Sequence, residues 1–443
     1  MNRENVLNFF PFLRLFPIRT ETLKPDIQAG LIIAMVLVPQ SMAYAELAGL
    51  PPQYGLYCSI IPCIIAALWG SSAHLSTGPV AMISLVVATT LGGLARPGSS
   101  YYIQLAQGSC LIAGVFFILF SIFRLDKLIR KIDRAVIKGF TSAAAIIIIL
   151  SQLNKIIGFD LSDLAEYDQL FNRLSPGILL TIAAGGVALW ALFMLKKLFP
   201  RSPSVLIVII AAALSTLFIN RLLQHEVIAT VGHIPAGLPK FGVPAGLTWG
   251  DYIKLIPGGL VIAVLGTLEV YSISSTIAEK TGQQLNFRQE FLGQGLACLG
   301  GGFSAGYPGS GSFSRSALAY SSGGRTALTS ITAGLSVLVV LLFFSGLLSY
   351  LPRFALAAVI ISAVYKLIDF RICTEFWHDN RRSLISFIVT FGTTLIFQDN
   401  IIMCIIIGIL TSQGLKLVAK FVKAPKMLKS KPGLLQHDNS CGI

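Results

Sequence analysis

Apolar runs long enough to cross a lipid bilayer recur along the whole chain. Of the 443 residues, 54% are hydrophobic and only 12% are charged, about half the charged fraction of an average soluble protein. The chain is therefore expected to be an all-α polytopic membrane protein. The first run, 27–45, leads into further runs without a small-residue cleavage site, so it is not expected to be a signal peptide.

Hydropathy, at about 20 residues for each span, predicts about fourteen transmembrane segments. Several of them are too short to cross a membrane alone. They lie near residues 27–45, 53–70, 79–94, 101–123, 135–153, 176–195, 204–220, 255–277, 289–303, 313–321, 327–349, 354–368, 383–398 and 401–420.

The net charge of +14 is unevenly spread. Basic residues cluster between Arg124 and Lys138 and again between Lys416 and Lys431. Such clusters are typical of cytoplasmic loops and attract anionic lipid, so membrane lipid is an expected partner and nucleic acid is not. The predicted location is the cell membrane, the inner membrane if the source is bacterial, with both termini in the cytoplasm.

The third and tenth segments differ from the others. Ser76-Thr77-Gly78-Pro79 opens one of them and Gly309-Ser310-Gly311-Ser312 opens the other. Short segments interrupted by glycine or proline, at matching positions seven apart, are typical of transporters built from inverted repeats with a binding site at the midplane. The first segment has a break of its own at Pro39.

A site between these two segments would suit an anion. Pro79 fits the first turn of a helix, and Ser76/Thr77 and Ser312/Ser314 are expected N-caps. Two facing helix N-termini present unpaired N–H groups and the positive ends of two dipoles. Arg315 adds a full charge with a planar fork suited to oxyanions, and a charge at that depth is expensive unless it has a function.

Three further polar residues lie in apolar segments. Glu269 could exchange a proton in proton-coupled transport, or form a structural pair with Arg315 or another polar partner, and the two roles are compatible. Gln40 and Tyr44, four apart, share one face of the first segment. They are candidate ligands, or else a capping glutamine and a tyrosine that fills a gap.

The sequence lacks the residues needed for nucleotide binding, metal binding or catalysis. Ser310-Gly311-Ser312 has no following Gly-Lys-Ser/Thr for a nucleotide, and the five histidines show no metal-ligand spacing. No cofactor or metal is expected. The chain is not expected to be an enzyme, because its nearest approach to a catalytic group, the set Glu375, His378 and Asp379, lies beside arginines typical of a membrane anchor. The acidic loop 160–168 has no calcium-binding frame.

Several ordered motifs resemble the sulfate permease family of anion transporters. The resemblance extends over both halves of the chain to about Lys420. The matching stretches are Pro39-Gln40-Ser41-Met42-Ala43-Tyr44-Ala45, Leu50-Pro51-Pro52-Gln53-Tyr54-Gly55-Leu56-Tyr57, Gly70 to His74, Ser76 to Ala81, Gln289-Glu290-Phe291, Gly306-Tyr307-Pro308, Gly311 to Ala317 and Gly324-Arg325-Thr326.

The resemblance implies a seven-plus-seven inverted repeat with a core and a gate domain, the core moving as an elevator. It places the anion between the third and tenth segments, where Glu269 occupies a position linked to proton or ion coupling. The implied substrate-binding residues are Gln40, Tyr44, Gly78, Val80, Ser314 and Arg315.

The expected domains are a cytoplasmic segment at 1–26, a transport domain at 27–421 and a short basic tail at 422–443. The two repeats are expected at about 27–220 and 255–421. Family members commonly continue into a cytoplasmic STAS domain, but about 23 residues follow Lys420 here, too few to bury a core. The regulation and dimer contacts of that domain cannot be carried over, although a homodimer stays open.

The sequence thus predicts a secondary active transporter of a small inorganic oxyanion. Sulfate is the first candidate substrate, and transport is expected to be coupled to protons. Bicarbonate, chloride and dicarboxylates are alternative substrates, because helix dipoles and one arginine select charge better than identity. A channel and a non-transporting anion-binding protein are alternative classes.

Overall fold

The computed structural model describes residues 11–15, 20–125, 133–157, 176–199, 203–224, 227–397 and 401–428. Within these ranges the chain is almost entirely helical. The long and medium helices are α2 (Thr20–Leu47), α3 (Gln53–Trp69), α4 (Ala81–Gly92), α5 (Ser100–Ile122), α7 (Arg134–Ile157), α9 (Pro176–Leu198), α10 (Ser204–Leu222), α11 (Trp249–Thr281), α12 (Phe287–Phe303), α13 (Phe313–Ser321), α14 (Leu328–Phe343), α16 (Arg353–Val364), α17 (Arg371–Asp379), α18 (Arg381–Ile396) and α19 (Ile401–Leu428).

The remaining elements are short. They are the helix α15 (Ser345–Leu348), the 3-10 helices η1 (Pro11–Leu15) and η3 (Tyr365–Leu367), and the strands β1 (Thr77–Gly78) and β2 (Ser310–Gly311). Each predicted apolar segment overlaps at least one helix. The first helix begins earlier than predicted, at Thr20, and it continues through Pro39, where the sequence has its break.

The exposed surface supports a membrane protein. Among the described residues, six helices, including α9 and α10, are long and apolar enough to cross a bilayer. Only 17% of the most apolar 18-residue stretch of α9, and 28% of that of α10, is buried within the protein. Large apolar side chains such as Val187, Trp190, Leu214 and Phe218 instead face outward. Such surfaces are favourable in lipid and unfavourable in water.

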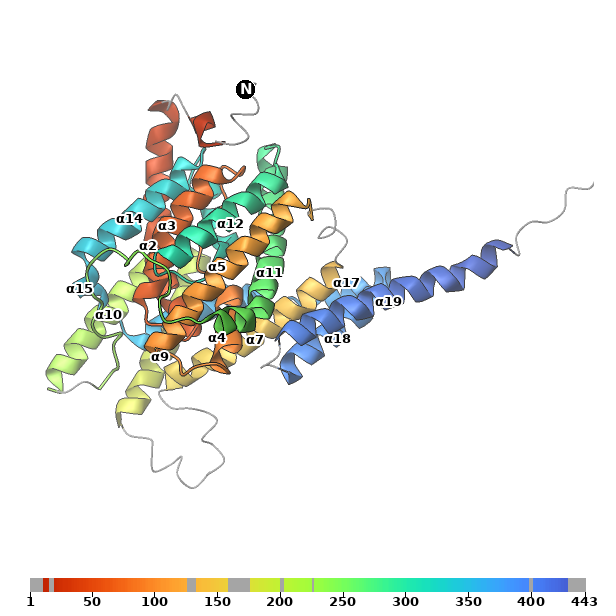
Figure 1. Ribbon diagram of the computed structural model, residues 1–443. Coiled ribbons are helices and arrows are strands. Elements are labelled where there is room, and N and C mark those ends of the chain that lie inside the picture. The colour runs from red at the N-terminus through yellow and green to blue at the C-terminus, as the bar shows by residue number, and fades with distance from the viewer. Residues whose placement is uncertain are drawn as a thin grey trace, which may run out of the picture.

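The helices pack as two groups. Helices α2, α3, α4, α5, α11, α12, α13 and α14 pack mainly on one another, and we call them the site bundle. Helices α7, α9, α10, α16, α17, α18 and α19 form the flanking bundle, in which α18 packs on both α7 and α19. Figure 1 shows α18 beside α19 at one side of the molecule, with the end of α19 projecting beyond the other helices. The two bundles meet chiefly where α16 and α10 pack on α2 and where α4 packs on α7.

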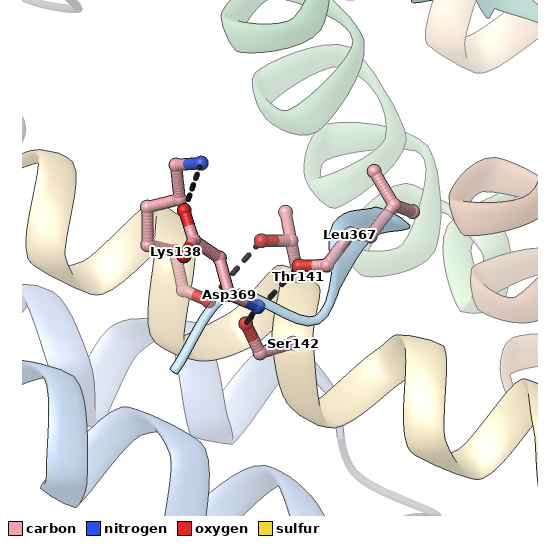
Figure 2. A network of polar contacts seen from close by, with 5 residues as sticks. All are labelled: Lys138, Thr141, Ser142, Leu367 and Asp369. Atoms are coloured by element: carbon pink, nitrogen blue, oxygen red, sulfur yellow. Dashed lines mark hydrogen bonds and ion pairs between the residues drawn. The ribbon is translucent and has the colours of Figure 1, made fainter. Parts of the chain in front are cut away.

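Polar contacts join distant parts of each bundle. In the flanking bundle, Lys138 of α7 pairs with Asp369 at 3.5 Å, and the Ser142 hydroxyl donates to the carbonyl of Leu367, at the end of η3 (Figure 2). The backbone N–H of Asp369 donates in turn to the Ser142 hydroxyl. These bonds fix the connection between α16 and α17 against the first turns of α7.

In the site bundle, two buried carboxylates hold loops of the opposite half of the chain. Asp26 of α2 accepts hydrogen bonds from the backbone N–H groups of Arg325 and Thr326, and from the hydroxyls of Thr326 and Thr329. Asp26 is completely buried and helical. The first helix therefore begins before residue 27, where the apolar run starts, because its first turns are anchored by polar contacts that a hydropathy criterion does not detect.

Glu290 of α12 holds a loop of the first half of the chain, as Asp26 holds a loop of the second half. Its carboxylate accepts from the N–H groups of Ser71 and Ser72 and from the Ser71 hydroxyl. The loop at Ser71 and Ser72 leads into β1, and the loop at Arg325 and Thr326 follows α13. The two carboxylates therefore fix the ends of the two segments that contain β1 and β2. A buried carboxylate is tolerable when several donors satisfy it.

Candidate functional site

Two short strands bring the unusual segments of the sequence together. Strand β1 pairs antiparallel with β2, with Thr77 opposite Gly311 and Gly78 opposite Ser310. The N–H of Ser312 donates to the carbonyl of Ser76 at 2.9 Å. Each strand leads into a short helix, α4 of 12 residues and α13 of 9 residues. The pairing of the strands therefore brings the starts of the two helices to one junction.

The N-cap of α4 differs from the predicted one, whereas the predicted N-cap Ser312 of α13 is confirmed in position. The N-cap of α4 is Val80, two residues after Gly78, because residues 76–78 are extended and paired with β2. Pro79 therefore precedes the helix and does not occupy its first turn. Ser312 is the N-cap of α13, but its hydroxyl bonds to that of Ser314 at 3.3 Å rather than to the helix backbone. Neither cap side chain satisfies a first-turn N–H group, and helix N-termini in this state favour an anion.

Arg315 crosses the junction from one segment to the other. Its side chain, 0% exposed, donates from Nη1 to the carbonyl of Pro79 at 3.0 Å. A Cβ added to Gly78 would lie 3.2 Å from Nη2, so the absence of a side chain at residue 78 leaves room for the guanidinium. Gly78 has a φ of 155°, a backbone conformation that other residues rarely adopt.

The rest of the guanidinium is unsatisfied. Arg315 Nε and Nη2 are buried and have no hydrogen-bond partner. Buried donors without partners are rare and costly. The free edge of the fork presents three N–H groups of a cation, which is the geometry that binds two oxygens of an oxyanion.

Gln40 and Tyr44 lie on the buried side of α2, with 4% and 5% exposure. The Oε1 atom of Gln40 has no hydrogen-bond partner. Tyr44 is near enough to interact electrostatically with both Arg315 and Glu269. Tyr44 therefore links α2 to the junction, and Gln40 adds an unsatisfied polar atom one turn away.

Glu269 lies in the buried part of α11, and its Oε2 atom has no hydrogen-bond partner. Among the ion pairs of the described residues, none joins Glu269 to Arg315 within 4.0 Å, although the two groups interact at longer range. The direct ion pair considered from the sequence is thus not formed. Ser310 of β2 is the polar neighbour of the carboxyl, and its hydroxyl also donates to the carbonyl of Gly266 at 3.3 Å.

The remaining predicted ligands differ in exposure. Val80 is buried at the start of α4, whereas Ser314 is exposed. Phe313, the first residue of α13, is 54% exposed. One side of the α13 N-terminus therefore opens outward from the protein while Arg315, on the same turn, faces the junction.

Three buried residues near the junction, Gln294, Tyr307 and Ser84, were not predicted as site residues. Gln294 of α12 donates from Nε2 to the Thr77 hydroxyl at 2.8 Å, and its Oε1 is unsatisfied. The hydroxyls of Tyr307 and Ser84 lie 3.1 Å apart. The only sequence signal for Gln294 is an amide in an apolar segment, four residues after Glu290 and so on the same helix face.

Other candidate chemistries gain no support from the residues that can be described. No group of three or more His, Cys, Asp or Glu side chains that could hold a metal occurs among them. Glu375 and His378 are exposed on α17. The acidic loop 160–168 lies outside the described residues.

The sequence is similar to known proteins over most of its length. The family model for the sulfate permease family matches residues 23–390. Sulfate transporter 4.1, chloroplastic, of Arabidopsis thaliana is 34% identical over 407 residues, which are 90% of this chain and 58% of that protein. A probable sulfate transporter of Mycobacterium tuberculosis is 36% identical over 354 residues, covering 78% of this chain and 62% of its own. The chain thus spans about three fifths of the length of these relatives.

Solved structures share the fold. The murine Solute Carrier 26 family member A9 anion transporter, in its inward-facing state, has a TM-score of 0.85 and 19% identity over 95% of this chain and 72% of its own. The transmembrane domain of a cyanobacterial bicarbonate transporter, BicA, has a TM-score of 0.75 and 21% identity, covering 89% of this chain and 98% of that domain.

Proposed function

Because the chain belongs to the sulfate permease family, we propose that it is a secondary active transporter of a small inorganic oxyanion, with sulfate as the first candidate. The observation that carries the proposal is the buried guanidinium of Arg315, with Nε and Nη2 unpartnered beside Gly78. A dianion with tetrahedral oxygens would satisfy both donors and the N–H groups at the two helix N-termini. The names of the curated relatives favour sulfate.

The transport cycle that we propose moves the site bundle against the flanking bundle. Under this proposal fourteen segments form an inverted seven-plus-seven repeat, the site bundle is the core domain, and the flanking bundle is the gate. The anion binds between α4 and α13, with Gln40, Tyr44, Gly78, Val80, Ser314 and Arg315 around it. The dense packing within each bundle, compared with the few helix contacts between them, supports movement of two rigid units.

Proton coupling is proposed to reside on Glu269. Its carboxyl has an unsatisfied oxygen and lies near Ser310 and Tyr44, within range of the charge of Arg315. A proton bound there removes a negative charge from the site, so the protein binds an anion more readily. The bound proton and the bound anion therefore favour each other's binding, and the protein takes them up together.

The test is uptake of radiolabelled sulfate into proteoliposomes that contain the full chain. Saturable uptake that a proton gradient drives uphill supports a carrier. Competition with unlabelled bicarbonate, chloride and dicarboxylates identifies a different preferred anion, and a large anion conductance without saturation indicates a channel. If the protein transports another anion and does not transport sulfate, that anion takes the place of sulfate in the proposal, and the proposed site is unchanged.

A further inference from the structure

An ion pair joins the two bundles at the ends of α2 and α7. Lys155, in the last turn of α7, places its Nζ 2.8 Å from Oε2 of Glu46, in the last turn of α2. The two side chains are 27% and 12% exposed. Among the ion pairs formed by the described residues, this is the one that connects a helix of the site bundle with a helix of the flanking bundle.

The other ion pairs cannot affect movement between the bundles. Lys138–Asp369 and Lys416–Asp133 both lie within the flanking bundle, and Lys254–Asp251 lies within the first turns of α11. The helices of the two bundles otherwise share one apolar core, which includes Leu37 of α2 as well as Ile148 of α7 and Val359 of α16. Apolar surfaces can slide past each other with little change in energy, whereas a charge pair is favourable at one relative position only.

Glu46 is also directly connected to the site. It follows Tyr44 by two residues on the same continuous helix, so a displacement of α2 that carries Gln40 and Tyr44 carries Glu46 as well. Lys155 stays with α7. Any sliding of the site bundle therefore separates the two charges, which then need water or new partners.

We propose that Glu46 and Lys155 form a latch that holds the two bundles in the position described here and closes the site at the ends of α2 and α7. This inference rests on the proposed transport cycle and on the predicted cytoplasmic N-terminus, which puts those ends on the external side of the membrane. The latch stabilises the state that is open to the cytoplasm, and its rupture accompanies opening to the outside. The ion pair shifts the equilibrium between the two states, although neither side chain contacts the anion.

The experiment measures which side of the membrane reaches the site. Ser314→Cys, exposed at the start of α13, is labelled in proteoliposomes with a membrane-impermeant charged maleimide added from outside, and the unsubstituted chain gives the background from native cysteines. Adding Glu46→Gln or Lys155→Gln should raise external labelling by about two- to fivefold, as expected for loss of a partly exposed ion pair. The charge swap Glu46→Lys with Lys155→Glu should return labelling toward the parent value.

The matched control is Lys138→Gln, which removes a cation of α7 whose partner is in the same bundle. It should leave external labelling unchanged. Equal labelling of the parent and both single variants would overturn the latch, and so would a charge swap that behaves like the single variants. Sulfate-dependent thermal stabilisation of the parent is measured in parallel: its absence contradicts the proposed anion site, whereas unchanged labelling with stabilisation intact contradicts the latch alone.

Discussion

Arg315 donates a hydrogen bond from Nη1 to the carbonyl oxygen of Pro79, over 3.0 Å and across 236 residues of sequence. This bond joins the residue that precedes α4 to the first turn of α13. It orients the guanidinium so that Nε and Nη2 remain free for another acceptor. The bond is thus a structural support for the site as well as a contact between the two halves of the chain.

Gly78→Ala should weaken anion binding. The added Cβ would lie 3.2 Å from Arg315 Nη2, at a φ of 155°, so either the guanidinium or the backbone must move. A strained backbone of this kind costs about 1–3 kcal/mol, and displacement of Nη2 removes a donor from the site. Sulfate concentration series in a thermal-shift assay should give an apparent Kd at least about fivefold higher.

Gly92→Ala is the control for this change. Gly92 is the last residue of α4, and a Cβ there meets no atom within 4 Å. Its apparent Kd should equal that of the unsubstituted chain. Equal affinities for Gly78→Ala and Gly92→Ala would show that the close approach of Gly78 to Arg315 has no part in binding.

Glu269→Gln should remove the pH dependence of uptake. If the carboxyl carries the coupled proton, sulfate uptake by the unsubstituted protein rises as the external pH falls, because protonation removes a negative charge from the site. The amide is neutral at every pH, so the variant should bind sulfate but give a flat profile. Uptake is measured between pH 5 and 8 with the internal pH fixed, and a variant that keeps the full slope would exclude Glu269 as the coupling group.

Asp26→Asn should destabilise the protein without a specific effect on sulfate. Asp26 accepts four hydrogen bonds from residues 325–329, and the amide can accept only through one oxygen and places an NH2 group against donors. The expected cost is about 2–4 kcal/mol, seen as a lower apparent Tm in detergent.

Asp369→Asn provides the comparison, because that carboxylate is 36% exposed in its pair with Lys138. Exposed pairs contribute about 0–1 kcal/mol. A drop in Tm as large for Asp369→Asn as for Asp26→Asn would contradict the importance assigned to the buried contacts of Asp26.

The sequence predicted the helices better than the details of the junction. Apolar runs located the long apolar helices, because membrane insertion depends on total apolar length, but they did not locate the polar helix α17. Ser76 and Thr77 were expected to cap a helix, since their residue types favour that role. They lie instead in an extended segment paired with β2, and a partner more than 200 residues away cannot be recognised from local preference.

Site residues were predictable where charge or motif marked them. Arg315 and Glu269 are conspicuous charges in apolar segments, and Gln40 and Tyr44 lie in a motif shared with the family. Gln294 was missed because its position beside Thr77 depends on how α12 packs against the first half of the chain. Asp26 was placed in an N-terminal segment because its four donors come from the other half of the chain.

Sulfate uptake by Arg315→Ala proteoliposomes tests the account most directly. The control is Arg325→Ala, which removes an exposed arginine ten residues further on, and gel filtration and apparent Tm establish that both variants are folded. Loss of a buried charged donor to an anion is worth about 2–5 kcal/mol, so Arg315→Ala should lower uptake at least about thirtyfold, while Arg325→Ala stays close to the unsubstituted rate. Folded Arg315→Ala protein that transports sulfate at the unsubstituted rate would contradict the proposed site.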